Sequence, residues 1–204
     1  MKEKNVKSIL QILKNDIHST TVATVSDDFK PEVRTIDIML ADENTIYFIT
    51  ARGKNFYERL INQKYVAING VKNGIGITIK GNVETAPKEL LEKVFEENIY
   101  LKDIYPEGTR DILEVFCIRN GQGEYIDLNI TPFYRQVFTL GDYKVKRNYY
   151  QINKNCIKCD TCVERCPTSC ILKAQQYEIQ QNTCVHCGTC KTVCRFNAID
   201  LIKE

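Results

Sequence analysis

The stretch that decides the organisation of this chain is CIKCDTCVERCP at residues 156–167, which returns 28 residues later as CVHCGTCKTVCR at residues 184–195. Each copy spaces its four cysteines at intervals of three, three and four residues. Nine of the ten cysteines lie between residues 156 and 194, and the first 155 residues hold only Cys117. A disulfide scaffold spreads its cysteines over a short secreted fold, whereas a dense cluster in a reducing compartment indicates bound metal.

Both runs resemble the cysteine run of bacterial ferredoxins, and the first copy also carries the proline that follows it, Pro167. In that family three cysteines of a run bind one cluster and the fourth binds the other. The resemblance therefore implies two 4Fe–4S clusters with crossed ligands. One would be bound by Cys156, Cys159, Cys162 and Cys194, and the other by Cys184, Cys187, Cys190 and Cys166.

Structural zinc is the alternative reading of paired Cys-x2-Cys motifs. A zinc ion takes four ligands, and two separate pairs of cysteines suffice for it. A zinc site does not need a third cysteine three residues further along, or a fourth cysteine four residues after that one. Here both of these extra cysteines occur in each of the two runs. The spacing therefore favours iron–sulfur clusters over zinc.

Some residues near the clusters are excluded as ligands. Cys170 aligns with Ala198 at the 28-residue offset, which is typical of a small buried position, and Cys117 stands alone inside a predicted strand. His186 lies between two ligand cysteines and is expected to lie at the surface or behind the ligands. Arg195 replaces the usual proline, which we expect to affect solvent access or charge near one cluster.

The first 150 residues read as a β domain. A helix is predicted from Val6 to Ile17 by apolar residues at helical spacing, and others at 55–63 and after Pro87. Runs rich in β-branched and aromatic residues predict strands, with a turn at 120–123. Many short strands favour an antiparallel barrel. The strands are expected at 20–26, 33–40, 45–50, 65–71, 75–84, 112–119, 124–128 and 133–140, and a short one at 177–181.

Composition and charge exclude several classes of function. With 28 Lys and Arg against 26 Asp and Glu, the net charge is +2, too small to favour nucleic-acid binding. No apolar run approaches the roughly 20 residues of a membrane helix, and the start does not resemble a signal peptide. We therefore expect a cytoplasmic protein with neither nucleic acid nor membrane as partner.

The segment 34–39 (RTIDIM), followed by 47–54 (YFITARGK), resembles the FMN-binding split barrel of the pyridoxamine 5′-phosphate oxidase-like family. FMN carries a phosphate, which needs cations and free backbone amides such as those opening a helix. Lys54, with either Arg34 or Arg52, is the candidate for that phosphate, although on charge alone 52–54 also reads as a solvated basic turn. The resemblance further implies that FMN contacts Thr35, Ile36, Asp37 and Thr50.

The same comparison argues against vitamin B6 oxidation. Met39 stands where the true oxidases carry a lysine, and the chain contains no tryptophan for their C-terminal substrate segment. A glycine-rich nicotinamide-binding unit is also missing.

Pattern and resemblance together predict a mainly β (α+β) protein. An antiparallel split β-barrel with flanking helices occupies residues 1–147, and a small ferredoxin-like iron–sulfur domain occupies residues 148–204. The expected function is an iron–sulfur flavoprotein oxidoreductase that passes electrons between a redox protein, the clusters, FMN and a small molecule. The family further implies a homodimer. An electron carrier or a redox sensor without its own substrate is the alternative.

Overall fold

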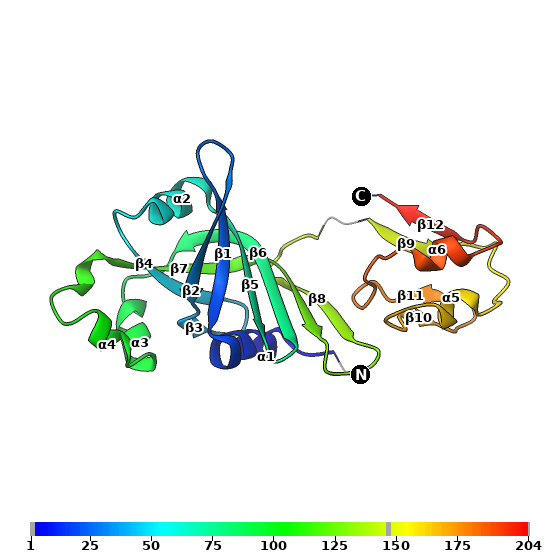
Figure 1. The fold of residues 1–204 in the computed structure, drawn as a ribbon, viewed down its shortest axis with the longest axis horizontal. Coiled ribbons are helices and arrows are strands. Elements are labelled where there is room, and N and C mark those ends of the chain that lie inside the picture. The colour runs from blue at the N-terminus through cyan, green and yellow to red at the C-terminus, as the bar shows by residue number, and fades with distance from the viewer. Residues whose placement is uncertain (1–2, 146–147, 204) are drawn as a thin grey trace. The chain divides into compact units, whose positions relative to one another are not determined.

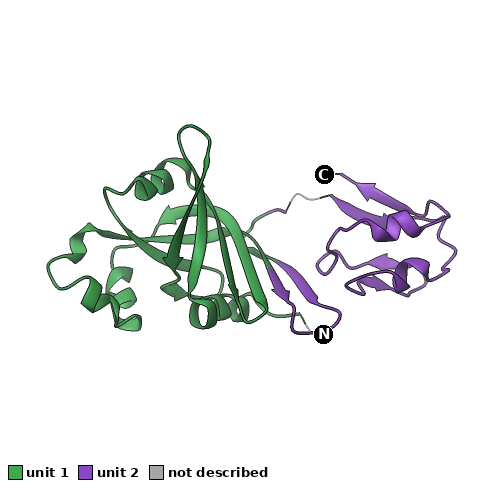
Figure 2. Cartoon of the chain, in the orientation of Figure 1, with its two compact units in different colours: residues 1–124, 138–143 green, residues 125–137, 144–204 purple. Residues whose placement is uncertain are grey.

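The computed structural model describes residues 3–145 and 148–203. The chain divides into two compact units, residues 1–124 with 138–143 and residues 125–137 with 144–204 (Figure 2). The domain boundary predicted between residues 147 and 148 touches residue 147, which lies outside the described residues. That boundary therefore stays a prediction.

In the described ranges, eight strands form one curled sheet in the order β2-β1-β5-β6-β7-β4-β3, with β8 paired to β7 (Figure 1). The pairs β1–β2, β1–β5, β5–β6, β3–β4 and β4–β7 are antiparallel. This confirms the predicted mainly β architecture with an antiparallel barrel-like sheet. The strands are β1 (Ser19–Val25), β2 (Pro31–Asp37), β3 (Leu40–Ala41), β4 (Ile46–Ala51), β5 (Tyr65–Lys72), β6 (Ile75–Thr85), β7 (Leu113–Asp127) and β8 (Tyr134–Leu140).

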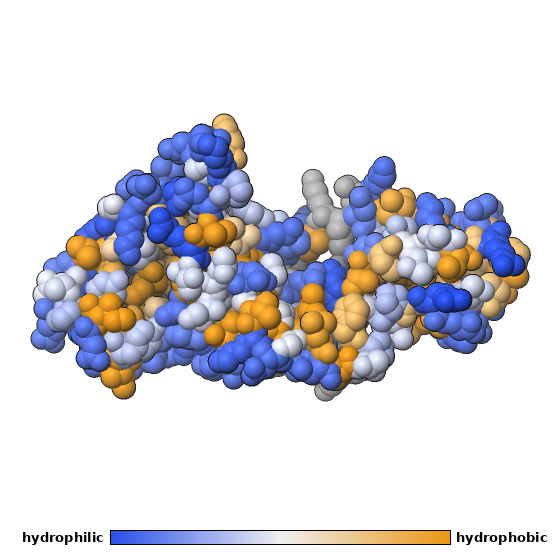
Figure 3. All heavy atoms as spheres, in the orientation of Figure 1, coloured by the Kyte–Doolittle hydropathy of each residue, from blue (hydrophilic) through white to orange (hydrophobic). Residues whose placement is uncertain are grey.

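Strand β6 shows how the sequence pattern builds the sheet. Ile77 and Ile79 are fully buried on one face, while Thr78 and Lys80, which alternate with them, are exposed. Burying each isoleucine stabilises the fold by roughly 1.5–3 kcal/mol. Single apolar side chains also remain in solvent, among them Phe29, which is 90% exposed. Figure 3 shows such residues interspersed with hydrophilic ones on the face in view, as is ordinary for a protein surface.

Short helices flank the sheet of the first unit. The predicted opening helix forms as α1 (Val6–Gln11), whose first turn is capped by the Asn5 side chain, and continues as a π-helix over Ile12–Ile17. Helix α2 (Asn55–Gln63) has the predicted bounds, and α3 (Leu90–Glu97) follows Pro87. The sequence did not predict α4 (Leu101–Ile104) or the 3₁₀ turn Arg110–Ile112.

The turn predicted at residues 120–123 is wrong, because β7 runs unbroken through them. Gly121 lies where β7 passes close to β6: a Cβ atom there would stand 2.5 Å from the Lys80 carbonyl oxygen and 2.8 Å from the Gly81 Cα. A Cβ on Gly123 would overlap the Phe138 ring. These glycines therefore permit close approach of neighbouring groups rather than a change of chain direction.

We expect Gly121→Ala to destabilise the protein, because backbone atoms of β6 cannot yield to the added methyl as a side chain would. The free energy of unfolding should fall by about 1–3 kcal/mol. Gly76→Ala is the matched control, since its Cβ would meet only a Val71 methyl, at 3.8 Å. That control should change stability by no more than about 0.5 kcal/mol. Urea unfolding followed by circular dichroism measures both, and equal midpoints for the two variants would refute the close-packing argument.

The strand predicted at 33–40 is also divided, at Ile38 and Met39. Strand β2 ends with Asp37 paired to Ser19 of β1, and β3 begins with Leu40 paired to Tyr47 of β4. Between β2 and β3 the chain stops pairing with β1 and begins to pair with β4. The Met39 amide there donates to the Tyr47 carbonyl at 2.8 Å. The bend leaves Asp37 at a strand end.

The second unit repeats a small pattern around its cysteines. The predicted strand at 177–181 is present as β11, and the duplicated cysteine loops lead into helices α5 and α6, whose caps Asp160 and Gly188 both adopt left-handed backbone angles. Two-stranded ladders join β9 to β12 and β10 to β11. The elements are β9 (Tyr149–Ile152), α5 (Thr161–Glu164), β10 (Ile171–Leu172), β11 (Glu178–Ile179), α6 (Thr189–Val193) and β12 (Ile199–Ile202).

Candidate functional site

An open hollow of about 470 Å³ lies in the first unit, lined by residues of β2, β4 and the start of α2 together with residues 100–105. This volume is typical of a small-molecule site. The structure brings six of the seven residues predicted for FMN to this hollow: Arg34, Thr35, Ile36, Asp37, Thr50 and Lys54.

One end of the hollow is suited to an anion. Lys54 is the N-cap residue of the nine-residue helix α2, and its extended backbone leaves the first amides of the helix facing outward. Gly53 precedes it with φ +81°, a conformation that glycine adopts freely. Arg34 and Lys54 are both exposed and both line the hollow. Two cations beside a helix N-terminus match the charge of a phosphate.

Arg52 is the predicted residue that the structure places elsewhere. Its guanidinium donates to the Asp111 carbonyl and lies 3.5 Å from a Glu114 carboxylate oxygen. Both partners lie about sixty residues further along the chain, so local sequence did not reveal them. Of the two arginines considered for the phosphate, Arg34 is therefore the one that lines the hollow together with Lys54.

Residues at and after the start of α4 complete the hollow, and the sequence reasoning missed them. Tyr100, Leu101, Ile104 and Tyr105 also line it. The available signal was the apolar spacing of 101, 104 and 105 after the predicted helix. The side chains that line the hollow combine cations, hydroxyls and apolar groups, and this set fits FMN, which has a charged phosphate and an apolar ring system.

The second unit gathers the first predicted set of cluster ligands. A small cavity of about 20 Å³ is lined by Cys156, Cys159, Cys162 and Cys194 together. Burial, and then the neighbouring thiolates, raise the pKa of the Cys162 thiol. A bound iron cluster would reverse this effect, since it binds thiolates and favours their deprotonation. Cys194 thus lies with the first run although its own run is the second.

Cys190, which belongs to the other predicted set, is buried. Burial, followed by the charges of Cys184 and Cys187, raises the pKa of Cys190 to about 11. In the described residues no three His, Cys, Asp or Glu side chains are placed as ligands of a single metal ion.

Cys170, which we excluded as a ligand, is buried as expected but has polar sulfur neighbours. Its Sγ lies 3.4 Å from Sγ of Cys166. A hydrogen bond with the Cys184 side chain, and then burial, raise the pKa of Cys170. Cys170 therefore contacts one predicted ligand from each run, Cys166 from the first and Cys184 from the second.

Threonine hydroxyls also lie beside the cysteine sulfurs. Thr161 Oγ1 is 3.5 Å from Cys159 Sγ, and Thr189 Oγ1 is 3.3 Å from Cys187 Sγ. The motif Cys-x-Thr in both runs was a signal for these contacts that the sequence reasoning did not use. Hydrogen bonds to sulfur are one of the means by which a protein sets cluster potential.

Comparison with family models finds two matches. Residues 5–115 match the pyridoxamine 5′-phosphate oxidase model, and residues 177–200 match the 4Fe-4S binding domain model. The first match covers more than half of the chain and includes the residues that line the hollow. The second covers the whole second cysteine run.

Curated relatives match the C-terminal part. A protein named ferredoxin 7Fe from Hydrogenibacillus schlegelii is 43% identical over 53 residues, which is 24% of this chain and 68% of the relative. The pyruvate synthase subunit PorD of Methanothermobacter marburgensis is 41% identical over 49 residues, 24% of this chain and 58% of the subunit.

Solved structures match the N-terminal part. A nimC/nimA family protein from Clostridium acetobutylicum aligns with a TM-score of 0.56 and 23% identity, over 66% of this chain and 93% of that protein. A pyridoxamine 5′-phosphate oxidase-related, FMN binding protein from Nostoc punctiforme aligns with a TM-score of 0.53 and 15% identity, over 70% and 94%. At these identities the likeness shows the fold alone. No helix among the described residues is long and apolar enough to cross a membrane.

Proposed function

The chain belongs to the pyridoxamine 5′-phosphate oxidase family and carries a C-terminal 4Fe-4S ferredoxin domain, and from this we propose that it is an iron–sulfur flavoprotein oxidoreductase. Electrons would enter from a redox protein, pass through two 4Fe–4S clusters and FMN, and reduce a small molecule. The observation that carries this proposal is the meeting of six predicted FMN residues in one hollow of a chain that also carries an electron-transfer domain.

Different residues of the hollow bind different parts of FMN. Lys54 and Arg34 bind the phosphate beside the N-terminus of α2, and Thr50 offers a hydroxyl to the polar part of the flavin. Ile36 and Phe56, which are buried, supply apolar surface for its rings. Bound FMN supplies the exchange between one-electron and two-electron chemistry.

The two-cluster assignment extends the family match to the first cysteine run. Its support is the 28-residue repeat together with the cavity shared by Cys156, Cys159, Cys162 and Cys194. Thiolates that bind such clusters must stay reduced, and for this reason we propose the cytoplasm as the compartment. We also propose the homodimer of the related family, which sedimentation equilibrium tests.

Reoxidation of the dithionite-reduced protein separates an enzyme from a carrier. Under anaerobic conditions we expect at least one class of small electrophile, from a panel of quinones, nitroaromatics and conjugated carbonyl compounds, to reoxidise the flavin. Protein stripped of FMN, which retains its clusters, is the control and should lose this reaction. Reoxidation by redox proteins alone, equal with and without FMN, would show a ferredoxin-type carrier instead.

A further inference from the structure

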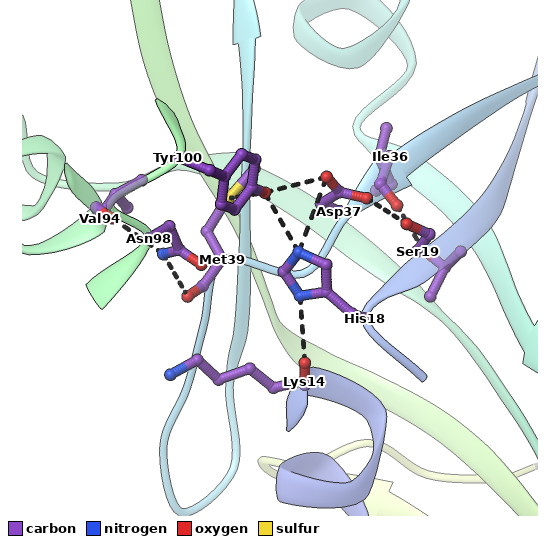
Figure 4. A network of polar contacts seen from close by, with 10 residues as sticks. Lys14, His18, Ser19, Ile36, Asp37, Met39, Val94, Asn98 and Tyr100 are labelled. Carbon is purple, nitrogen blue, oxygen red and sulfur yellow. Dashed lines mark hydrogen bonds and ion pairs between the residues drawn. The ribbon is translucent and has the colours of Figure 1, made fainter. Parts of the chain in front are cut away.

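A polar network beside the hollow joins Asp37, one of the predicted FMN residues, to His18 and Tyr100, neither of which was predicted to contact FMN (Figure 4). The Tyr100 hydroxyl donates to Asp37 Oδ2 at 2.9 Å, and its oxygen lies 3.1 Å from Nε2 of His18. Nδ1 of His18 lies 3.2 Å from the Lys14 carbonyl oxygen, and Ser19 Oγ donates to the other Asp37 oxygen at 2.5 Å. Asp37 and Tyr100 line the hollow, and Nε2 of His18 lies close to both of them.

Counting hydrogens decides the protonation state that this network requires. A carbonyl oxygen only accepts, so Nδ1 must carry a hydrogen to bond Lys14. The single hydroxyl hydrogen of Tyr100 goes to Asp37, so the Tyr100 oxygen must accept from Nε2 of His18. An imidazole with hydrogens on both nitrogens is a cation. With Asp37 ionised, all three hydrogen bonds are therefore made together only when His18 is protonated, and a neutral ring loses one of them.

Backbone hydrogen bonds hold His18 in an uncommon backbone conformation. Its φ is 62° and its ψ is −68°, at the junction of the π-helix and β1. The His18 amide donates to the Leu13 carbonyl at 2.8 Å, and its carbonyl accepts from the Ile38 amide at 2.9 Å. A non-glycine residue at positive φ is strained, and it persists only where its surroundings impose that conformation.

The network also connects solvent to the hollow. The His18 side chain is 33% exposed, so it can exchange protons with water, whereas Asp37 and Tyr100 face the ligand space. The nearby cation of Lys14 is engaged by Glu97. Burial, and then the hydrogen bond to Asp37, raise the pKa of Tyr100, so the phenol keeps its proton unless another replaces it.

Resting on the proposed function, we infer that His18, Tyr100 and Asp37 form a proton relay into the hollow. Iron–sulfur clusters deliver electrons without protons, whereas a flavin that gains two electrons also takes up at least one proton. Two electrons come from the external donor through the clusters. The Tyr100 hydroxyl turns from Asp37 and gives its proton to the group reduced in the hollow, as the Tyr100 oxygen takes the Nε2 proton of His18. His18 becomes neutral and regains its proton from water, so no phenolate forms beside Asp37.

Stopped-flow reduction of the holoprotein by dithionite tests the relay, with FMN and the clusters followed at separate wavelengths. Tyr100→Phe keeps the ring but removes the hydroxyl, and we expect flavin reduction to slow about tenfold or more while the clusters bleach at the wild-type rate. Tyr57→Phe is the matched control, because its hydroxyl bonds Glu114 at 2.6 Å and does not line the hollow. It should reduce at the wild-type rate.

His18→Gly adds a readout that a purely structural role would not give. Glycine adopts the backbone angles of position 18 without strain, and it leaves room for a free imidazole. We expect flavin reduction to be slow in this variant. Added imidazole should restore the rate when Tyr100 is present, but not in the double variant that also carries Tyr100→Phe. Flavin fluorescence measures FMN binding in each variant. Full-rate reduction with FMN bound overturns the relay alone, whereas wild-type protein that binds no FMN overturns the proposed function and the relay with it.

Discussion

Replacing Cys194 by serine should remove about half of the iron, and the lost cluster should be the one held by the first cysteine run. The reason is geometric: Cys194 lines the same cavity as Cys156, Cys159 and Cys162. A cluster deprived of one of four thiolates is bound poorly, since metal binding and local folding are coupled. Iron and acid-labile sulfide assays on anaerobically purified protein measure the loss.

Double variants identify which cluster is lost. If Cys156 and Cys194 bind one cluster, the Cys156→Ser/Cys194→Ser protein should keep as much iron as either single variant. Cys184→Ser/Cys194→Ser should then keep almost none, because each change damages a different cluster. Cys117→Ala, in the first unit and far from both runs in sequence, is the control and should keep all its iron. The opposite result for the two double variants would show that the ligands do not cross.

Lys54→Ala should lower FMN affinity tenfold or more and leave both clusters in place. A charge-assisted hydrogen bond to phosphate contributes roughly 1.5–3 kcal/mol, and each 1.4 kcal/mol is a factor of ten in Kd. Arg34→Ala should have a similar effect, because it lines the same hollow. Quenching of FMN fluorescence on titration measures Kd.

Two further variants make the Lys54 result specific. Lys64→Ala removes the same charge at the opposite end of α2 and should not change the Kd for FMN. Arg52→Ala distinguishes the two arginines considered from the sequence, since the Arg52 side chain is bonded to Asp111 and Glu114. A loss of affinity with Arg52→Ala but not with Arg34→Ala would place the phosphate at the other arginine.

The sequence predicted features that depend on neighbours along the chain. Helix α2 has its predicted bounds because its apolar spacing is local, and β6 alternates as its isoleucines do. The grouping of Cys194 with the first run came from a family resemblance, and the shared cavity agrees with it. Sequence reasoning succeeded for α2 and β6, where spacing along the chain carries the geometry.

Features that depend on distant packing were not predictable in this way. Gly121 looked like a turn residue, because the sequence does not distinguish a glycine that turns the chain from one that lets β6 approach. The orientation of the Arg52 side chain depends on its contact with Glu114, which lies sixty-two residues further along the chain. Tyr100 enters the hollow only because α4 packs there, and His18 joins it through an uncommon backbone angle.

The content of iron, sulfide and flavin in the anaerobically purified full chain shows whether the cysteine runs and the hollow hold redox cofactors. We expect a brown protein with about eight iron atoms, about as many sulfides and one FMN per chain. A colourless protein that holds zinc or no metal would contradict this expectation, because no electrons could then reach the hollow through the cysteine runs.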